Sequence, residues 1–220
     1  MAGEAAGAVL RIVGMAREAR LAQGPACVGV ADLAARLRGA RAAVSFGLCG
    51  ALDPALRPAD LVIGEAVVFA GGEIACDARL VAALAAALPA ARIGKVAGGE
   101  RMIGSAAGKA ALAETTGAVI VDMESLAAAR AAQAAGVPFV VLRAVSDGAA
   151  RTLPRAAMAG FSASGGVNVG AVVASLARRP WELPALIRTA REAEAGFRAL
   201  QDAAAAIDGA VDEALGAVVR

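Results

Sequence analysis

Short runs of Val, Ile, Leu and Phe alternate along the chain with alanine-rich segments of helical character, and this alternation restricts the fold more than any other feature. Continuous apolar strands separated by helices are typical of α/β domains whose sheet is covered on both faces. We therefore predict an α/β fold: a single domain over 1–220, with a central, mostly parallel (mixed) twisted sheet flanked by helices. The expected strands lie at 8–13, 27–30, 42–47, 61–70, 71–76, 91–98, 118–122 and 138–145, and the expected helices at 15–24, 31–39, 78–89, 108–117, 123–136 and 183–207.

The composition excludes several classes of function. The net charge of +2 comes from interspersed acidic and basic residues, so the sequence indicates no nucleic-acid partner. One tryptophan, five phenylalanines and no tyrosine leave little surface on which bases could stack. The chain has no histidine, which excludes histidine-based triads, and the spacing of Cys27, Cys49 and Cys76 matches no zinc motif. We predict no metal site, and buried thiols in a reducing cytoplasm.

Two segments raise the question of a membrane. No signal peptide is visible, and we expect a cytoplasmic protein. The segment 156–177 has no charged residue and is long enough to span a bilayer, but its serines, asparagine and glycines favour a loop and a buried helix. The amphipathic segment 178–200 either forms an apolar entrance or lies on a membrane surface, or else packs on the sheet or on a second subunit. Peripheral membrane contact therefore stays open.

Polar or glycine-rich residues follow several of the expected strands at the point where each strand ends. In open α/β sheets, ligands bind beyond the carboxyl ends of the strands. A glutamate follows the first strand, a glycine-rich turn follows the third, and carboxylates follow the strands at 118–122 and 138–145. We expect these residues to shape one pocket. They are Glu18, Gly47, Gly50, Asp122, Glu124 and Asp147.

The pair of Glu124 and Asp147 carries most of this prediction. The helix at 123–136 joins two strands that we expect to be parallel and adjacent, which would bring both carboxylates to one rim of the sheet. Two alternatives need no ligand. Asp122 can cap the helix, with Ser125 three residues later, and Asp147 with the following glycine can form an ordinary turn.

Three motifs together resemble one known family. VDMES at 121–125, RAVSD at 143–147 and GLCGAL at 47–52 are similar, in order and spacing, to the nucleoside phosphorylase and nucleosidase superfamily, which includes purine nucleoside phosphorylases and methylthioadenosine/S-adenosylhomocysteine nucleosidases. The segment from 151 onward resembles the branch associated with hopanoid biosynthesis, in which an adenosyl-hopane loses adenine. The resemblance implies a nucleoside phosphorylase-like fold and an enzyme that cleaves the N-glycosidic bond of a purine (adenine) nucleoside with a 5′ substituent.

The resemblance also implies roles for single residues. Asp147 would protonate the leaving purine, Glu124 would hold the ribose hydroxyls, and Glu18 would activate water. Breaking the bond builds positive charge on the sugar and negative charge on the base, which an acid and a carboxylate can assist. An acid that works at neutral pH must hold its proton there, which we expect from an apolar pocket. The residues implied around the substrate are Ser146, Met123, Met102, Ile103, Gly47, Gly50 and, unless it is only a helix cap, Asp122.

The nucleophile stays open between phosphate and water. Phosphorylases of this superfamily commonly carry Ser or Thr where this chain has Leu48, and many carry an arginine in place of Glu18. Both differences favour water, although Arg17, Arg20 or Ser45 could still bind phosphate. The segment GSAAGK at 104–109 is similar to a phosphate loop but lacks its first glycine and its final Ser or Thr. We predict no cofactor, with phosphate as the one co-substrate that the resemblance allows.

Two other functions remain as alternatives. One is a methylthioadenosine/S-adenosylhomocysteine-type nucleosidase, and the other is a non-catalytic nucleoside- or lipid-binding module on the same fold. The expected partner is a purine nucleoside, either free or linked to a lipid. The resemblance also implies a homo-oligomer.

Overall fold

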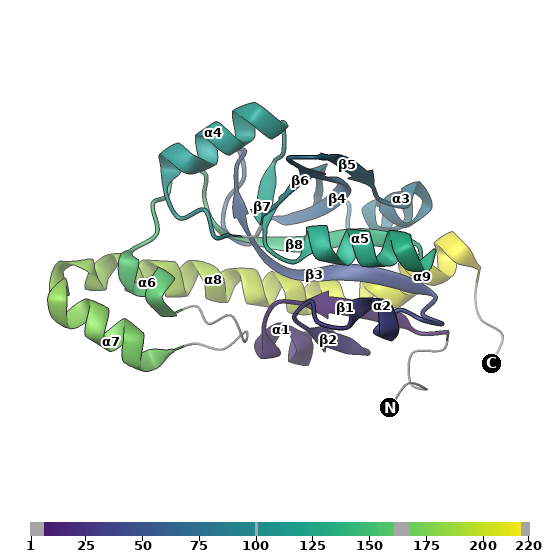
Figure 1. The fold of residues 1–220 in the computed structure, drawn as a ribbon, viewed down its shortest axis with the longest axis horizontal. Helices are drawn as coiled ribbons and strands as arrows, with labels where there is room; N and C mark the ends of the chain where they lie inside the picture. Colours follow the sequence, from purple (N-terminus) through teal and green to yellow (C-terminus); the bar gives the residue numbers. More distant parts are fainter. Residues whose placement is uncertain (1–6, 100, 161–167, 217–220) are drawn as a thin grey trace.

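The computed structural model describes residues 7–99, 101–160 and 168–216. They form a mixed sheet with helices on both faces (Figure 1), so the predicted α/β fold is confirmed. The strands are β1 (Val9–Val13), β2 (Ala26–Val28), β3 (Ala42–Ala51), β4 (Leu61–Phe69), β5 (Gly72–Ala75), β6 (Arg92–Gly98), β7 (Ile120–Asp122) and β8 (Phe139–Asp147). The helices are α1 (Ala16–Leu21), α2 (Leu33–Arg36), α3 (Ala78–Ala87), α4 (Ala106–Thr116), α5 (Ser125–Ala135), α6 (Arg155–Gly160), α7 (Val169–Arg178), the 3-10 helix η1 (Pro180–Glu182), α8 (Leu183–Ala204) and α9 (Ala206–Leu215).

Five strands close part of the sheet into a ring. β3 pairs with β8 in parallel, and β8 pairs with β4 in antiparallel orientation. β4 and β6, and then β6 and β7, pair in parallel, and β7 returns to β3 in antiparallel orientation. β1 and β2 extend the ring beyond β3, and β5 is the antiparallel hairpin partner of β4. The closure brings the ends of β3, β7 and β8 together.

The expectation that the strands before and after α5 are adjacent and parallel is wrong. β7 and β8 lie on the two sides of β3, where Gly50 pairs with Val121 of β7 and with Asp147 of β8. β3 continues to Ala51 instead of turning after position 47, because the glycines of GLCGAL permit an extended strand whose register shifts between Cys49 and Gly50. Gly50 thus joins the two segments that carry the predicted carboxylates.

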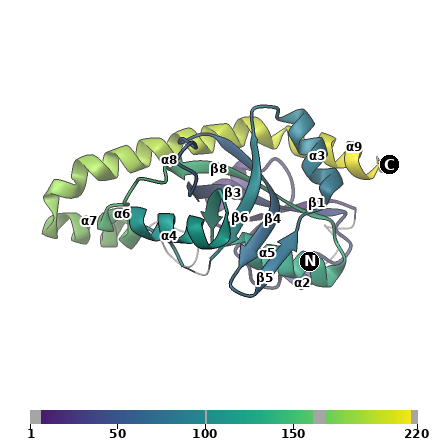
Figure 2. The same cartoon turned by 90° about the horizontal axis from the view of Figure 1, so that it is seen from above.

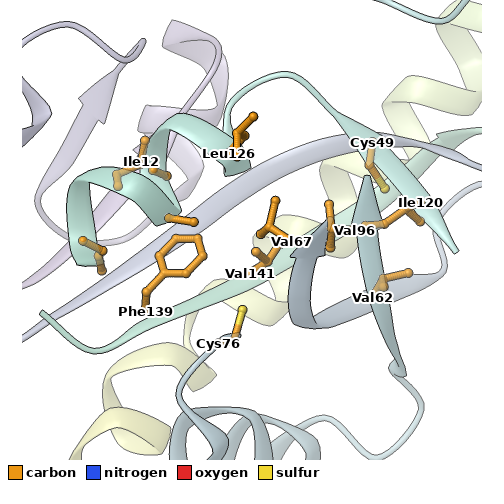
Figure 3. Close-up of a cluster of buried hydrophobic side chains, with 14 of the residues drawn as sticks. Ile12, Cys49, Val62, Val67, Cys76, Val96, Ile120, Leu126, Phe139 and Val141 are labelled. Carbon is orange, nitrogen blue, oxygen red and sulfur yellow. The ribbon is translucent and has the colours of Figure 1, made fainter. Parts of the chain in front are cut away.

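Two hydrophobic cores lie on the two faces of the sheet. In the first, Val67, Val96 and Val141 of neighbouring strands pack near Leu126 of α5 (Figure 3). In the second, residues such as Leu200 pack with β-strand residues and with side chains from α3 and α9. Burying a side chain of this size stabilises the fold by roughly 1.5–3 kcal/mol. The two cores hold the strand ends in fixed positions.

The prediction of a buried helix within 156–177 is wrong for 169–177, which belong to α7. α7 has no buried residue along its ten residues, and Figure 2 shows it beyond the sheet, beside the first part of α8. It cannot reach the sheet because α8 already covers β3 and β8. Positions 161–167 of the same prediction lie outside the described residues. Among the described helices, none combines the length and the apolar character needed to cross a bilayer.

Candidate active site

A cavity of about 790 Å³ opens where the ends of β1, β3, β7 and β8 meet. Its size is typical of ligand sites, which measure roughly 300–1,000 Å³. Carboxylates from separate parts of the chain face it: Glu18 from α1, Asp122 and Glu124 from the junction of β7 with α5, and Asp147 from the end of β8. Of the residues predicted from the sequence, those that line the cavity are Glu18, Gly50, Met102, Ile103, Asp122, Met123, Glu124, Ser146 and Asp147.

Glu18 is buried in the first turn of α1, where its carboxylate accepts three backbone hydrogen bonds. The N–H groups of Gly14 and Met15 donate to Oε2 at 2.8 and 2.9 Å, and the N–H of Leu48 donates to Oε1 at 2.8 Å. Burial raises the pKa of Glu18 above its usual value, while the nearby Arg143 guanidinium and these N–H groups partly offset the rise. A carboxylate that is fixed in place and more basic than usual is suited to accept a proton.

The fully buried Arg143 of β8 connects two further carboxylates. Its Nε lies 2.7 Å from Asp122 Oδ2, and its Nη2 lies 3.2 Å from Glu124 Oε2. Asp122 also accepts the N–H of Ser125 at 3.1 Å, so it contacts the start of α5 as well as the cavity. The motifs did not single out Arg143. One feature of the sequence could have indicated it: Arg143 is a charged residue within the apolar run 138–145. A charge buried in a strand requires buried partners of opposite charge.

Glu124 shares one wall of the cavity with Glu18. Burial raises the pKa of Glu124; Arg143 opposes this rise, and the carboxylates of Asp122 and Glu18 add to it. Gly14 lies against both glutamates: its N–H binds Glu18, and a Cβ on it would fall 2.5 Å from Glu124 Oε1. Only glycine fits where the backbone passes so close to a carboxylate.

Gly47 is the one predicted site residue that does not line the cavity. It lies beneath the acidic wall, where a Cβ would fall 2.5 Å from Glu18 Oε1 and 2.6 Å from Arg143 Nη1. The absence of a side chain therefore leaves room for these two groups. Gly47 acts on the site only through Glu18 and Arg143.

Asp147 is 5% exposed and has polar partners at both of its oxygens. Ser146 Oγ lies 2.7 Å from Asp147 Oδ1, and Oδ2 forms an ion pair with the ammonium of Lys109 from α4. Lys109 also donates to the carbonyl oxygen of Gly148 at 2.9 Å. Asp147 therefore does not lie in the wholly apolar surroundings that were expected around the acid. Lys109 is the lysine of the segment GSAAGK, and its side chain points into the protein. The packing of α4 sets this direction, which could not be inferred from the motif.

Apolar side chains form much of the remaining lining. They include Val121, Leu153 and Met158, together with the predicted Met102 and Ile103. This leaves an apolar compartment beside the carboxylates. An apolar compartment with a few convergent polar groups is the usual form of a small-molecule site.

The residues that were considered for phosphate lie elsewhere. Arg17 pairs with Glu194 at 2.6 Å, and Ser45 is buried against Arg143 and Ser125. Neither these two nor Arg20 lines the cavity. The cationic side chains that do line it, among the described residues, are the exposed Arg101 and Arg130.

Comparison with protein families matches the model of the phosphorylase superfamily to residues 13–178. This range contains GLCGAL, VDMES and RAVSD and all the predicted site residues. Comparison with curated proteins finds no match.

Several solved structures share the fold. A Helicobacter pylori 5′-methylthioadenosine/S-adenosylhomocysteine nucleosidase, in complex with a substituted pyrrolidin-3-ol, aligns with a TM-score of 0.68 and 16% identity, over 94% of this chain and 99% of that chain. The futalosine hydrolase of the same organism aligns with a TM-score of 0.61 and 15% identity, over 90% and 98%. A Neisseria meningitidis nucleosidase of the first kind, in complex with methylthio-immucillin-A, gives 0.60 and 20%, over 89% and 98%. At these identities the likeness shows a shared fold.

Proposed function

This chain belongs to the phosphorylase superfamily, and from that premise we propose that it cleaves the N-glycosidic bond of a purine nucleoside and releases adenine. One observation carries the proposal: Glu18, Glu124 and Asp147 face a single cavity of about 790 Å³. Asp147, beside Ser146, delivers a proton to N7 of the departing base. Glu124 binds the ribose hydroxyls and stabilises the positive charge that forms on the sugar.

Water is the nucleophile that the charges favour. Glu18 lies near enough to Glu124 to raise its pKa, and the buried Arg143 beside them is already paired with Asp122 and Glu124. A phosphate dianion at this wall would meet two carboxylates, and like charges repel strongly in a buried site. Glu18 instead accepts a proton from water as the oxygen attacks the anomeric carbon.

Labelled phosphate tests the reaction class. The purified protein is incubated with 5′-substituted adenosines, with and without labelled phosphate, and adenine and sugar products are separated. We expect equal adenine release under both conditions and an unlabelled sugar. A labelled sugar 1-phosphate would identify phosphorolysis. Measurable nucleoside binding with no adenine from any analogue would identify a non-catalytic binding module.

The 5′ substituent is proposed to be large and apolar, as in adenosyl-hopane. Val30, Met123 and Met158 line the cavity and are 46, 44 and 40% exposed, so the cavity has apolar side chains at its opening to solvent. An alkyl or polycyclic chain attached at C5′ would cover these side chains, which a short polar substituent would leave in water.

A series of 5′-alkyl adenosines of increasing length tests this substrate class. Each buried methylene contributes about 0.8 kcal/mol, so kcat/KM should rise roughly fourfold per methylene until the chain leaves the protein. In Met158→Lys, kcat/KM should rise much less with chain length, while the rate with unsubstituted adenosine stays unchanged. A maximum at the methylthio compound would favour a methylthioadenosine/S-adenosylhomocysteine-type nucleosidase.

Peripheral contact with a membrane is proposed for the end of the molecule that α7 and the start of α8 form. α8 also lines the cavity through Thr189 and Ala193, so a lipid chain in the mouth would lie along the same helix. The exposed apolar residues are Val169, Val173, Trp181, Leu183 and Ile187.

Co-sedimentation with anionic vesicles at low salt tests this contact. Binding should weaken in Trp181→Glu, whose parent side chain is 71% exposed. Alternatively, the same surface could be the subunit interface of the predicted homo-oligomer. A Trp181→Glu protein that loses its oligomer while vesicles never retain the parent protein would assign the surface to a second subunit.

The rate should depend on pH through Glu18. Burial raises the pKa of Glu18, and a base works only when ionised, so kcat should fall as the pH drops through a value above 4.5, the usual value for glutamate. Glu18→Gln should lower kcat and remove the part of this acidic limb that Glu18 causes, leaving the part that comes from the ionisation of Glu124, whose pKa burial also raises. A limb that persists unchanged in Glu18→Gln would exclude Glu18 as the base.

Gly47→Ala tests the position of Glu18. The new methyl group would overlap the Glu18 carboxylate, and a displacement of about 1 Å can lower the rate by about 10²-fold. Gly209→Ala in α9 is the matched control, because a Cβ there meets nothing within 4 Å. We expect kcat to fall in Gly47→Ala and to stay unchanged in Gly209→Ala. Equal rates would contradict the role of Gly47.

A further inference from the structure

The buried lysine beside Asp147 has no task in the mechanism described so far. Lys109 is 0% exposed, and its ammonium contacts the Asp147 carboxylate and the carbonyl oxygen of Gly148. It does not line the cavity, so it can affect a substrate only through Asp147. Removing an ammonium from water costs several kcal/mol even when it is paired. If this position only supported the fold, an apolar side chain would fill it at a lower cost in desolvation free energy.

The ion pair also changes the starting state of the acid. Paired with an ammonium, Asp147 is a carboxylate, and a carboxylate has no proton to give to a base. The nearest N–H proton on an ionisable group is on Lys109 Nζ, which contacts Asp147 Oδ2 directly. The proton required at the base can therefore come through this contact.

Ser146 provides partners for Asp147 in both of its protonation states. Its hydroxyl carries one hydrogen but lies 2.7 Å from Asp147 Oδ1 and 3.0 Å from the carbonyl oxygen of Cys49. When Asp147 is ionised, Ser146 donates to it. When Lys109 passes its proton to Oδ2, the atom that it contacts, Ser146 can keep its hydrogen bond to Oδ1. Ser146 therefore holds Asp147 in place in both states.

We propose that Lys109 stores the proton that Asp147 passes to the departing base. This inference rests on the proposed adenine-releasing function. A Nζ–H bond of Lys109 breaks as an O–H bond forms on Asp147, and Asp147 gives a proton to N7. The C1′–N9 bond breaks, and its electron pair stays with adenine. Water adds to the sugar cation as Glu18 takes its proton. After the products leave, Glu18 releases that proton to solvent, and a proton from solvent returns through Asp147 to restore the Lys109 ammonium.

Charge is conserved at each stage of this relay. The resting pair of Lys109 and Asp147 is neutral, and proton transfer within the pair gives a neutral amine and a neutral acid. After the base is protonated, the pair carries one negative charge and the sugar one positive charge. Charges are therefore separated only when the base takes its proton, and the positive charge ends on the sugar, where the carboxylates already favour it.

Two substrates distinguish a proton source from a structural support. An adenine nucleoside needs its leaving group protonated. A p-nitrophenyl β-riboside does not, because its leaving group, p-nitrophenolate, is already a stable anion. Lys109→Met should lower kcat for the adenine nucleoside by about 10²-fold, within the usual range for general acid catalysis. The rate with the p-nitrophenyl riboside should stay close to that of the parent protein.

Lys109→Arg is the matched control for charge. Arginine can keep the positive charge next to Asp147, but its guanidinium does not give up a proton in proteins. We expect Lys109→Arg to cleave the p-nitrophenyl riboside and to remain slow with the adenine nucleoside. Recovery of the adenine rate in Lys109→Arg, or equal losses with both substrates in Lys109→Met and Lys109→Gln, would overturn the relay. If the parent protein cleaves neither substrate, the proposed function itself fails.

Discussion

Asparagine in place of Asp147 is expected to lower kcat for adenine release by about 10²–10⁴-fold. The amide can still form hydrogen bonds with Ser146 and with the base, but it cannot transfer a proton. KM should change much less than kcat, because the interaction that is lost belongs to the transition state. The measurement is single-turnover adenine release at saturating nucleoside, together with equilibrium binding of a non-cleavable analogue.

Asp147→Asn also leaves the ammonium of Lys109 without its carboxylate, so its folding needs a control. Breaking one side of a buried pair destabilises a protein by about 3–5 kcal/mol. The double variant Asp147→Asn, Lys109→Met removes both charges and should recover most of this stability while remaining inactive. A folded single variant that releases adenine at the parent rate would show that Asp147 is not the acid.

Arg143→Met is expected to reduce the free energy of unfolding by about 3–5 kcal/mol, a large fraction of the total for a domain. The substitution keeps much of the side-chain volume but leaves the buried Asp122 and the half-buried Glu124 without their cation. Urea unfolding followed by circular dichroism measures the change. The control is Arg198→Met, whose parent side chain is 76% exposed and which should change stability by less than about 0.5 kcal/mol.

Charge removal distinguishes the electrostatic effect of Arg143 from its packing. Adding Asp122→Asn and Glu124→Gln to Arg143→Met removes the two uncompensated carboxylates. Stability should then return most of the way to that of the parent, although nucleoside cleavage stays lost. If the triple variant is no more stable than Arg143→Met, the arginine contributes by packing alone.

The parts of the site that follow strand ends could be predicted from the sequence. Glu18, Glu124 and Asp147 each come after an apolar run, and the ends of such runs gather at one edge of a sheet. Local pattern sufficed there because each residue's position depends on its own strand. The path of β3 could not be predicted in this way. The glycines of GLCGAL are equally typical of a turn, and only pairing with β7 and β8 selects the extended form.

The two buried cations could not be predicted from the motifs. Lys109 and Arg143 are 0% exposed, and their partners are far away in the sequence or reached across the ring of strands. A charged residue in a helix or strand is most often on the surface, so its burial becomes evident only with its carboxylates in view. The exposed face of α7 was missed for the opposite reason. Its apolar residues are typical of a helix that packs on a sheet, but α8 already covers β3 and β8.

The most direct test is a crystal structure of the protein with a non-cleavable 5′-substituted adenosine analogue. The base should lie against Asp147 and Ser146, the ribose hydroxyls should lie within hydrogen-bond distance of Glu124, and the anomeric carbon should face Glu18 across the space for one water. An analogue bound elsewhere, or bound in this cavity with its ribose turned away from Glu124 and its base away from Asp147, would contradict the account.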